Sequence, residues 1–294
     1  MQFEKTLIVG AKGFLGRHFF YFYQRYFPAI IGTHYTFSSD FARLDLSTPK
    51  TDFQALSLQG YKYALIAGGI CNPQKCEENP YASYKINVDG ILFLSELLLA
   101  KGITPILVSS GYVFNGEIGN YMEEDPRSPI NWYGAQKAAL EKKALEQFKD
   151  QCLIVRIAKV FGIVKGDGTL IDEIILSLFQ SREVLAAKDQ ILSPISIQDV
   201  IQGITALQKN QCRGLYHLGG LEQINRYELA LKIARELQVN EHLIKKISLD
   251  ELPASFKRPK RSDLLSQKLL NHTNIKMTSL EENIKIITSQ YVPN

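Results

Sequence analysis

Tyr133 and Lys137 are the residues of this 294-residue chain whose types and spacing most directly suggest chemistry. They lie four positions apart, so a helix would carry the phenol and the ammonium on one face. An ammonium beside a phenol favours the phenolate and lowers its pKa, and such a tyrosine can give a proton to a carbonyl oxygen during a reduction. By itself, the pair is also common on solvated helix surfaces.

Two serines raise the pair above that alternative. Ser109 and Ser110 stand at the end of an apolar run that predicts a strand. In a doubly wound sheet, the carboxyl ends of the strands border the crevice where ligands bind. Ser110 can meet Tyr133 and Lys137 there, and its hydroxyl can hold a carbonyl and stabilise the developing oxyanion.

Three glycines early in the chain predict a turn that binds a dinucleotide. Gly10, Gly13 and Gly16 follow the apolar run Thr6–Val9 and open an expected helix. The first glycine allows a tight bend, the second lets the backbone approach the pyrophosphate, and the third permits close helix–strand packing. The helix N-terminus then faces the phosphates. An ordinary turn is the alternative, but a position between strand and helix favours the dinucleotide site.

The second expected strand favours NADP as the cofactor and leaves NAD as the alternative. Gly32–Ser39 contains no carboxylate that could bind the ribose 2′-hydroxyl of NAD. Lys12 could meet a 2′-phosphate, and Thr33 and His34 add hydrogen-bonding groups, although Lys12 and His34 could equally be solvated. Asp45 is expected either to bind the adenine amino group or to cap a turn.

These candidate residues must be held by alternating strands and helices. Helical patterns cover Gly13–Phe27, Tyr81–Lys101 and Pro129–Lys149, and apolar runs predict strands at Thr6–Val9, Pro28–Gly32, Arg43–Leu46, Tyr63–Ala67, Pro105–Ser109 and Cys152–Val155. Short strands joined by helices imply a parallel sheet covered on both faces. The predicted fold class is α/β, a doubly wound parallel (Rossmann) sheet with a smaller, mostly helical C-terminal substrate region.

The alternation of strands and helices changes after about Gly166, where helical segments dominate and Leu215–Leu218 is the one late strand candidate. We therefore expect a dinucleotide-binding Rossmann domain over residues 1–165 and a substrate-binding region over residues 166–294. Segments near residues 190–219 are expected to return to the first domain.

Composition narrows the class of protein. With 45% hydrophobic and 22% charged residues and a net charge of +4, the chain is typical of a globular protein and does not require a nucleic-acid partner. Four cysteines are too few for a disulfide scaffold and have poor metal-ligand spacing, so reduced thiols and no metal are expected. No apolar run reaches the ~18–20 residues that span a bilayer, and Met1–Lys5 lacks the features of a signal peptide. A cytoplasmic protein without a membrane partner is predicted.

Besides the glycine loop, three further segments of the chain contain recognisable motifs. Ser109–Gly116 is similar to Ser-Thr-Asp-Tyr-Val-Phe-x-Gly, Asn131–Lys137 contains Tyr-Gly-x-x-Lys, and Arg258–Leu264 reads Arg-Pro-x-x-Ser-x-Leu. In this order the motifs resemble the extended short-chain dehydrogenase/reductase superfamily, and within it the dTDP-4-dehydrorhamnose reductase family most closely. Asn87 lies on the helix where the superfamily keeps an active-site asparagine.

The resemblance implies an NADP(H)-dependent reductase of a nucleotide-activated keto sugar. Tyr133 would be the acid/base, Lys137 would bind the nicotinamide ribose and tune Tyr133, and Ser110 would hold the carbonyl. The expected cofactor contacts are Gly10, Lys12, Gly13, Phe14, Leu15, Gly16, Thr33, His34, Asp45, Leu46, Ala67, Gly68, Asn87, Tyr133 and Lys137. The expected substrate contacts are Ser110, Gly111, Lys159 and Arg258.

Departures from the family pattern lie on the substrate side and leave the sugar open. Gly111 stands where the family commonly has Asp, Gln74 replaces another Asp, and Lys159 stands where an aromatic contact to the sugar is often found. Arg258 is interpreted either as a contact to the substrate diphosphate or as a solvated loop residue.

Two other functions and the oligomeric state stay open. A sugar-nucleotide epimerase or dehydratase would use the same catalytic residues, although dehydratases usually carry acidic neighbours where this chain has Ser109 and Gly111. A non-catalytic, NADP-binding regulatory subunit, such as that of methionine adenosyltransferase, is also among the relatives of this branch. A homodimer is common in the superfamily and is expected on that ground alone.

Overall fold

The computed structural model describes residues 3–253 and 255–291, and the chain divides into two units. Unit 1 comprises the described residues of Met1–Val113 with Arg127–Arg156 and Ile204–Tyr216, and unit 2 comprises Phe114–Pro126, Ile157–Gly203 and those of His217–Asn294. The expected domains, residues 1–165 and 166–294, are continuous stretches of the chain, whereas each unit combines several segments. The expected bounds therefore stay a prediction. Met1 and Gln2, the first two residues of the segment that lacks signal-peptide features, lie outside the described residues.

A seven-stranded sheet organises unit 1. Its strand order is β11-β6-β5-β4-β1-β2-β3, and pairing is parallel from β3 through β2, β1 and β4 to β5. The strands are β1 (Thr6–Val9), β2 (Gly32–His34), β3 (Ala42–Arg43), β4 (Tyr63–Ile66), β5 (Thr104–Ser110), β6 (Leu153–Ile157) and β11 (Gly214–Leu218). The order reverses between β1 and β4, which is where such sheets bind ligands. The predicted doubly wound parallel sheet is confirmed.

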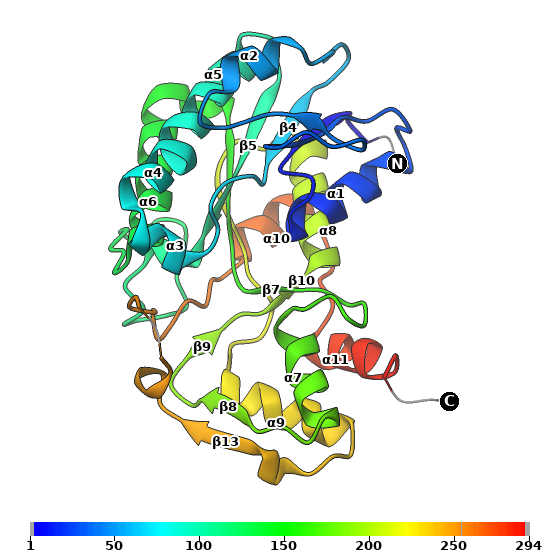
Figure 1. Ribbon diagram of the computed structural model, residues 1–294, viewed down its shortest axis with the longest axis vertical. Helices are drawn as coiled ribbons and strands as arrows, with labels where there is room; N and C mark the ends of the chain where they lie inside the picture. The colour runs from blue at the N-terminus through cyan, green and yellow to red at the C-terminus, as the bar shows by residue number, and fades with distance from the viewer. Residues whose placement is uncertain (1–2, 254, 292–294) are drawn as a thin grey trace. The chain divides into compact units, whose positions relative to one another are not determined.

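Helices cover both faces of this sheet. Helices α5 and α6 lie against one face and α1 against the other (Figure 1). The helices are α1 (Phe14–Gln24), α2 (Pro49–Gln54), α3 (Pro73–Glu78), α4 (Pro80–Tyr84), α5 (Ile91–Leu99), α6 (Trp132–Phe148) and the last part of α8 (Ile197–Lys209), with short 3-10 turns at Gly111–Val113 and Lys149–Gln151. Strands β1 and β4 are buried throughout, as expected of strands covered on both sides.

The second strand does not lie where the sequence predicted it. Residues 28–31 form a turn and its exit, and β2 begins at Gly32. The Ile30 N–H bonds to the Phe27 carbonyl at 2.9 Å and the Ile31 N–H bonds to the Tyr61 hydroxyl at 2.7 Å, so these two N–H groups are satisfied outside the sheet. The prediction of a strand at Pro28–Gly32 is therefore wrong, and Thr33 lies inside β2.

The long helix predicted over Tyr81–Lys101 is also divided. Between α4 and α5 the chain forms a π-helical segment, Lys85–Gly90. A Cβ at Gly90 would lie 1.9 Å from the Leu46 carbonyl oxygen, so the backbone approaches its neighbour closely there. A π-helical bulge is frequent at functional sites, and this one contains Asn87.

Unit 2 pairs short strands around helices. Its elements are β7 (Val160–Phe161), α7 (Leu170–Phe179), β8 (Val184–Ala187), β9 (Ile191–Leu192), β10 (Ile195–Ser196), β12 (Ile224–Asn225), α9 (Arg226–Glu236), β13 (Ile244–Ile247), α10 (Gln267–Thr273) and α11 (Leu280–Thr288), with 3-10 turns at Glu241–Leu243 and Leu249–Glu251. Strands pair as β10–β7, β12–β9 and β13–β8. The late strand predicted at Leu215–Leu218 is present as β11. The sequence pattern did not predict the three strand pairs of unit 2, because most of their strands are two residues long.

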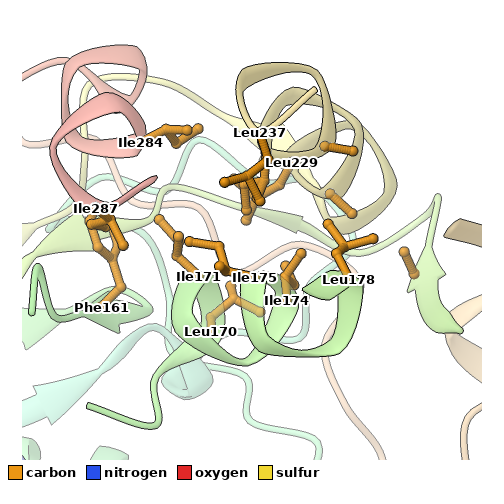
Figure 2. Packing of buried hydrophobic residues seen from close by; sticks show 14 of the residues in the cluster. Phe161, Leu170, Ile171, Ile174, Ile175, Leu178, Leu229, Leu237, Ile284 and Ile287 are labelled. Atoms are coloured by element: carbon orange, nitrogen blue, oxygen red, sulfur yellow. The ribbon is translucent and has the colours of Figure 1, made fainter. Parts of the chain in front are cut away.

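The core of unit 2 lies between its helices. Leu170, Ile171 and Ile175 of α7 face Leu229 of α9 and Ile287 of α11 (Figure 2). These side chains are at most 3% exposed, so they form a hydrophobic core separate from the sheet of unit 1.

Within residues 3–253 and 255–291, every helix is too short or too polar to span a bilayer.

Candidate active site

The glycine loop after β1 is held in a conformation that requires glycine. Gly10 has a φ of +84°, and a Cβ there would lie 2.6 Å from the Gly68 Cα. A Cβ at Gly16 would lie 2.2 Å from the Gly10 carbonyl oxygen, which confirms close packing between helix and loop. The Gly10 and Ala11 N–H groups donate to the Thr33 carbonyl at 3.1 and 2.8 Å, so the end of β2 supports the loop.

The start of α1 has the features of an anion site. Among the described residues, the Gly10 oxygen, at 3.4 Å, is the atom nearest to a Cβ added at Gly13, so the space there is open. Helix α1 has no side-chain cap and no acidic residue in its first turn. Lys12 is exposed beside it. First-turn N–H groups without a side-chain cap and the helix dipole favour a phosphate at this point.

The other residues expected to contact the cofactor differ in their burial and in their hydrogen bonds. Thr33 is fully buried and its hydroxyl has no hydrogen-bond partner within residues 3–253 and 255–291, whereas the His34 ring lies 2.9 Å from the Thr36 hydroxyl. Asp45 accepts the Ser47 N–H at 2.8 Å, so it caps a turn. Along the same edge, Phe14, Leu15, Ala67 and Gly68 are half-buried and Leu46 is buried.

Arg43 is a cation that the sequence analysis did not single out. It pairs in register with His34 across β3 and β2, which places a guanidinium beside the end of β2. Its Nη1 also lies 3.2 Å from Asp52. The single Arg in the third apolar run was the available signal.

Helix α6 brings Tyr133 and Lys137 together as the spacing predicted. The Lys137 Nζ lies 5.8 Å from the centroid of the Tyr133 ring and donates to the Val108 carbonyl at 2.8 Å. Asn131 caps the helix by accepting the Gly134 N–H at 2.8 Å, and Glu77 accepts the Trp132 N–H at 2.8 Å. The helix start is therefore fixed on two sides.

Ser110 joins this pair from the end of β5. A hydrogen bond links its side chain to that of Tyr133, and its hydroxyl accepts the Tyr112 N–H at 3.3 Å. The ring of Tyr112 packs edge-on against Tyr133, with centroids 5.9 Å apart. Gly111 is buried in the 3-10 turn that follows Ser110. The structure thus places the three predicted catalytic side chains in one neighbourhood.

Burial dominates the electrostatics of the pair. Desolvation raises the pKa of Tyr133, with a further increase from Cys71, and the hydrogen bond with Ser110 acts in the opposite direction. Desolvation lowers the pKa of Lys137. The prediction of a lowered pKa for Tyr133 is wrong for the groups that surround it here, because burial outweighs the effect of a neighbouring ammonium. Tyr133 holds its proton at neutral pH, and because a raised pKa weakens it as an acid, release of that proton would require stabilisation of the phenolate.

Asn87 acts on this region from inside the π-helical segment. Its amide nitrogen donates to Gln136 of α6 at 2.8 Å and to the Ile70 carbonyl at 3.0 Å, and its oxygen accepts the Ile70 N–H at 2.7 Å. The side chain is only 1% exposed. Asn87 therefore ties the loop after β4 to the helix of Tyr133 and Lys137.

Unit 2 contains the other expected substrate contacts, Lys159 and Arg258. Lys159 is near enough to Arg226 and Arg258 for their charges to act on it: partial desolvation and both guanidinium groups lower its pKa, and Glu173 raises it. Arg226, the first residue of α9, was not predicted as a site residue. Three cations against one carboxylate form a group suited to an anion.

Comparison with known proteins identifies the family that the motifs suggest. The sequence profile of the RmlD substrate binding domain family matches residues 4–292. The chain belongs to this family. The resemblance stated from the motifs is thereby confirmed at the level of the family.

Named relatives of this RmlD family member fall into two groups. A dTDP-4-dehydrorhamnose reductase of Aggregatibacter actinomycetemcomitans is 25% identical, with 96% of this chain and 98% of the relative covered. A methionine adenosyltransferase 2 subunit beta of Rattus norvegicus is 26% identical, with 90% and 81% covered. The crystal structure of a dTDP-4-dehydrorhamnose reductase from Bacillus anthracis in complex with NADP shares the fold, with a TM-score of 0.84, 23% identity, and 98% and 100% coverage.

In the part of the chain that the structure describes, no group of three or more His, Cys, Asp or Glu residues is placed to hold a metal ion. The polar groups of the candidate site are instead hydroxyl, amide and ammonium groups.

Proposed function

We propose that this protein is an NADP(H)-dependent reductase that transfers a hydride to a nucleotide-activated keto sugar. The carrying observation is the grouping of Ser110, Tyr133 and Lys137 at the end of β5 and the start of α6, where Tyr133 keeps its proton at neutral pH. A hydroxyl, a proton-donating phenol and an ammonium are the groups that carbonyl reduction requires.

The glycine loop fits a dinucleotide. Gly13 leaves room for a pyrophosphate, and the uncapped start of α1 supplies N–H donors. Lys12 and Arg43 offer positive charge to a 2′-phosphate, and the named relative from Bacillus anthracis was solved with NADP. These features support NADP over NAD.

The chemistry divides between cofactor and protein. When bound, the reduced nicotinamide supplies the hydride. Ser110 holds the substrate carbonyl oxygen by a hydrogen bond and stabilises charge on it. Tyr133 gives its phenolic proton to that oxygen, and Lys137 stabilises the phenolate that remains. Asn87 and Asn131 hold the loop and helix that position these groups.

The substrate side is supported by the cations of unit 2. Lys159, Arg226 and Arg258 together suit the diphosphate of a sugar nucleotide. The name of the relative from Aggregatibacter actinomycetemcomitans points to a dTDP-4-keto sugar. Location in the cytoplasm and a homodimer belong to this proposal as further predictions.

The cofactor preference has a direct test. NADPH should raise the melting temperature more than NADH at equal concentration, because a tighter ligand stabilises the folded state more. Lys12→Ala should weaken NADPH binding by about tenfold and leave the effect of NADH unchanged. Lys50→Ala, which removes an exposed lysine from α2, is the matched control. Equal shifts with both nucleotides would refute the role of Lys12.

The reaction class is tested with NADPH and a panel of 4-keto sugar nucleotides. A reductase forms NADP⁺ and a hydroxyl sugar in equal amounts. An epimerase or dehydratase would change the sugar without net loss of NADPH. A non-catalytic regulatory subunit would bind NADPH and leave every sugar unchanged; the relative from Rattus norvegicus is named as subunit beta of methionine adenosyltransferase 2.

A further inference from the structure

A buried carboxylate lies one helical turn beyond Lys137. Glu141 of α6 is completely buried. Arg156 of β6, also completely buried, donates from Nε to Glu141 Oε1 at 2.9 Å and from Nη2 to Oε2 at 2.7 Å. Arg127 adds a contact from Nη1 to Oε2 at 3.3 Å. The carboxylate is thus held by two guanidinium groups from outside its own helix.

The same carboxylate reaches the strand of the catalytic serine. The Ser109 hydroxyl donates to Glu141 Oε1, and Ser109 directly precedes Ser110 at the end of β5. The Lys137 ammonium in turn donates to the Val108 carbonyl, one residue earlier. Two consecutive residues of β5 are therefore fastened to α6, one through Glu141 and one through Lys137.

A buried ion pair is a costly way to stabilise a fold. Desolvation of both charges offsets much of their attraction, and well-packed apolar residues often serve as well. Net stabilisation is therefore a weak explanation for this pair, and the candidate catalytic groups nearest to it are those of α6.

We propose that Glu141 is a positioning residue for the Tyr133–Lys137 pair. Its carboxylate fixes, through Ser109, the strand end that carries Ser110, and its charge lies one helical turn from Lys137 on the same helix. The part that concerns turnover rests on the proposed function, whereas the part that concerns the proton on Lys137 does not.

The charges around Lys137 agree with this role. Burial lowers the pKa of Lys137, and Cys71 from the loop after β4, Glu141 from α6 and Cys76 from α3 raise it. Tyr133 lies on the same face of α6, and the Arg156 and Arg127 guanidinium groups bind the Glu141 carboxylate from β6 and the loop before α6. Glu141 is the one carboxylate among these groups. Loss of its charge must lower the pKa of Lys137 further.

The test measures the titration midpoint of the Lys137 ammonium directly. In protein labelled with ¹³C-lysine, the Lys137 signal is assigned with Lys137→Met, and its titration is recorded by NMR. Glu141→Gln should shift the midpoint to lower pH by about 1 unit. The alkaline limb of the pH–rate profile for NADPH oxidation should move by the same amount. Glu146→Gln, which removes an exposed carboxylate from the same helix, should move neither.

A second variant keeps the proposal testable if Glu141→Gln fails to fold. Glu141→Gln alone removes the carboxylate partner of buried Arg156, so Glu141→Gln with Arg156→Met is measured beside it. A downward shift of the Lys137 midpoint in folded Glu141→Gln supports the proposal, and the double variant, which loses one charge of each sign, should show a smaller shift in the same direction. An unchanged Lys137 midpoint in a folded variant with a lowered melting temperature would overturn it and leave Glu141 a purely structural residue. If the wild type turns over no keto sugar nucleotide, the proposed function fails, and the Lys137 midpoint still decides this inference.

Discussion

Replacing Tyr133 by phenylalanine should lower the rate of NADPH oxidation by a factor of about 10²–10⁴ and leave NADPH affinity unchanged. The substitution removes the hydroxyl that would give the proton and keeps the ring that packs against Tyr112. Burial raises the pKa of Tyr133, so the phenol is protonated across the neutral range. The loss should appear in kcat, because the missing interaction develops in the transition state.

Tyr112→Phe is the matched control for this prediction. It removes a neighbouring phenol hydroxyl in the same cluster and should retain most of the activity. NADPH titrations of both variants by fluorescence separate binding from turnover. Wild-type activity in Tyr133→Phe would remove Tyr133 from the mechanism.

Arg156→Met should lower the free energy of unfolding by about 3 kcal/mol. It deprives the completely buried Glu141 carboxylate of its bidentate partner, although Arg127 remains at 3.3 Å. Glu141→Leu combined with Arg156→Met should recover most of this loss, because apolar side chains can replace a buried ion pair with little net change.

Urea unfolding of the two variants measures the difference. Lys142→Met breaks an exposed ion pair with Glu146, 3.9 Å long, on the same helix and should change stability little. If the double variant were less stable than Arg156→Met alone, the cost would come from packing and not from a stranded charge.

Local patterns allowed the catalytic set to be predicted from sequence. The spacing of Tyr133 and Lys137 fixes their common face on any helix, and Ser110 ends a strand that an apolar run marks clearly. The glycine loop likewise depends on residues close in sequence. The fold class followed because β1, β4 and β5 are buried on both faces and separated by helices.

The features that the sequence could not predict depend on contacts between distant segments. Asn87 was expected from the family resemblance, but its place in a π-helical segment was not; there Gly90 packs against the Leu46 backbone, 44 residues earlier in sequence. Glu141 and Arg156 lie on an ordinary helix and strand, and only the packing of α6 against β6 makes them a buried pair. The raised pKa of Tyr133 has the same origin, because burial is a property of the folded chain.

The most direct measurement uses NADPH deuterated at the hydride position, together with the 4-keto sugar nucleotide that the protein accepts. A reductase should place one deuterium on the sugar carbon that carried the ketone, in an amount equal to the NADP⁺ formed. Tyr133→Phe should abolish both signals while still binding NADPH. An altered sugar without deuterium and without NADP⁺, or bound NADPH with no change in any sugar, would contradict the proposed reduction.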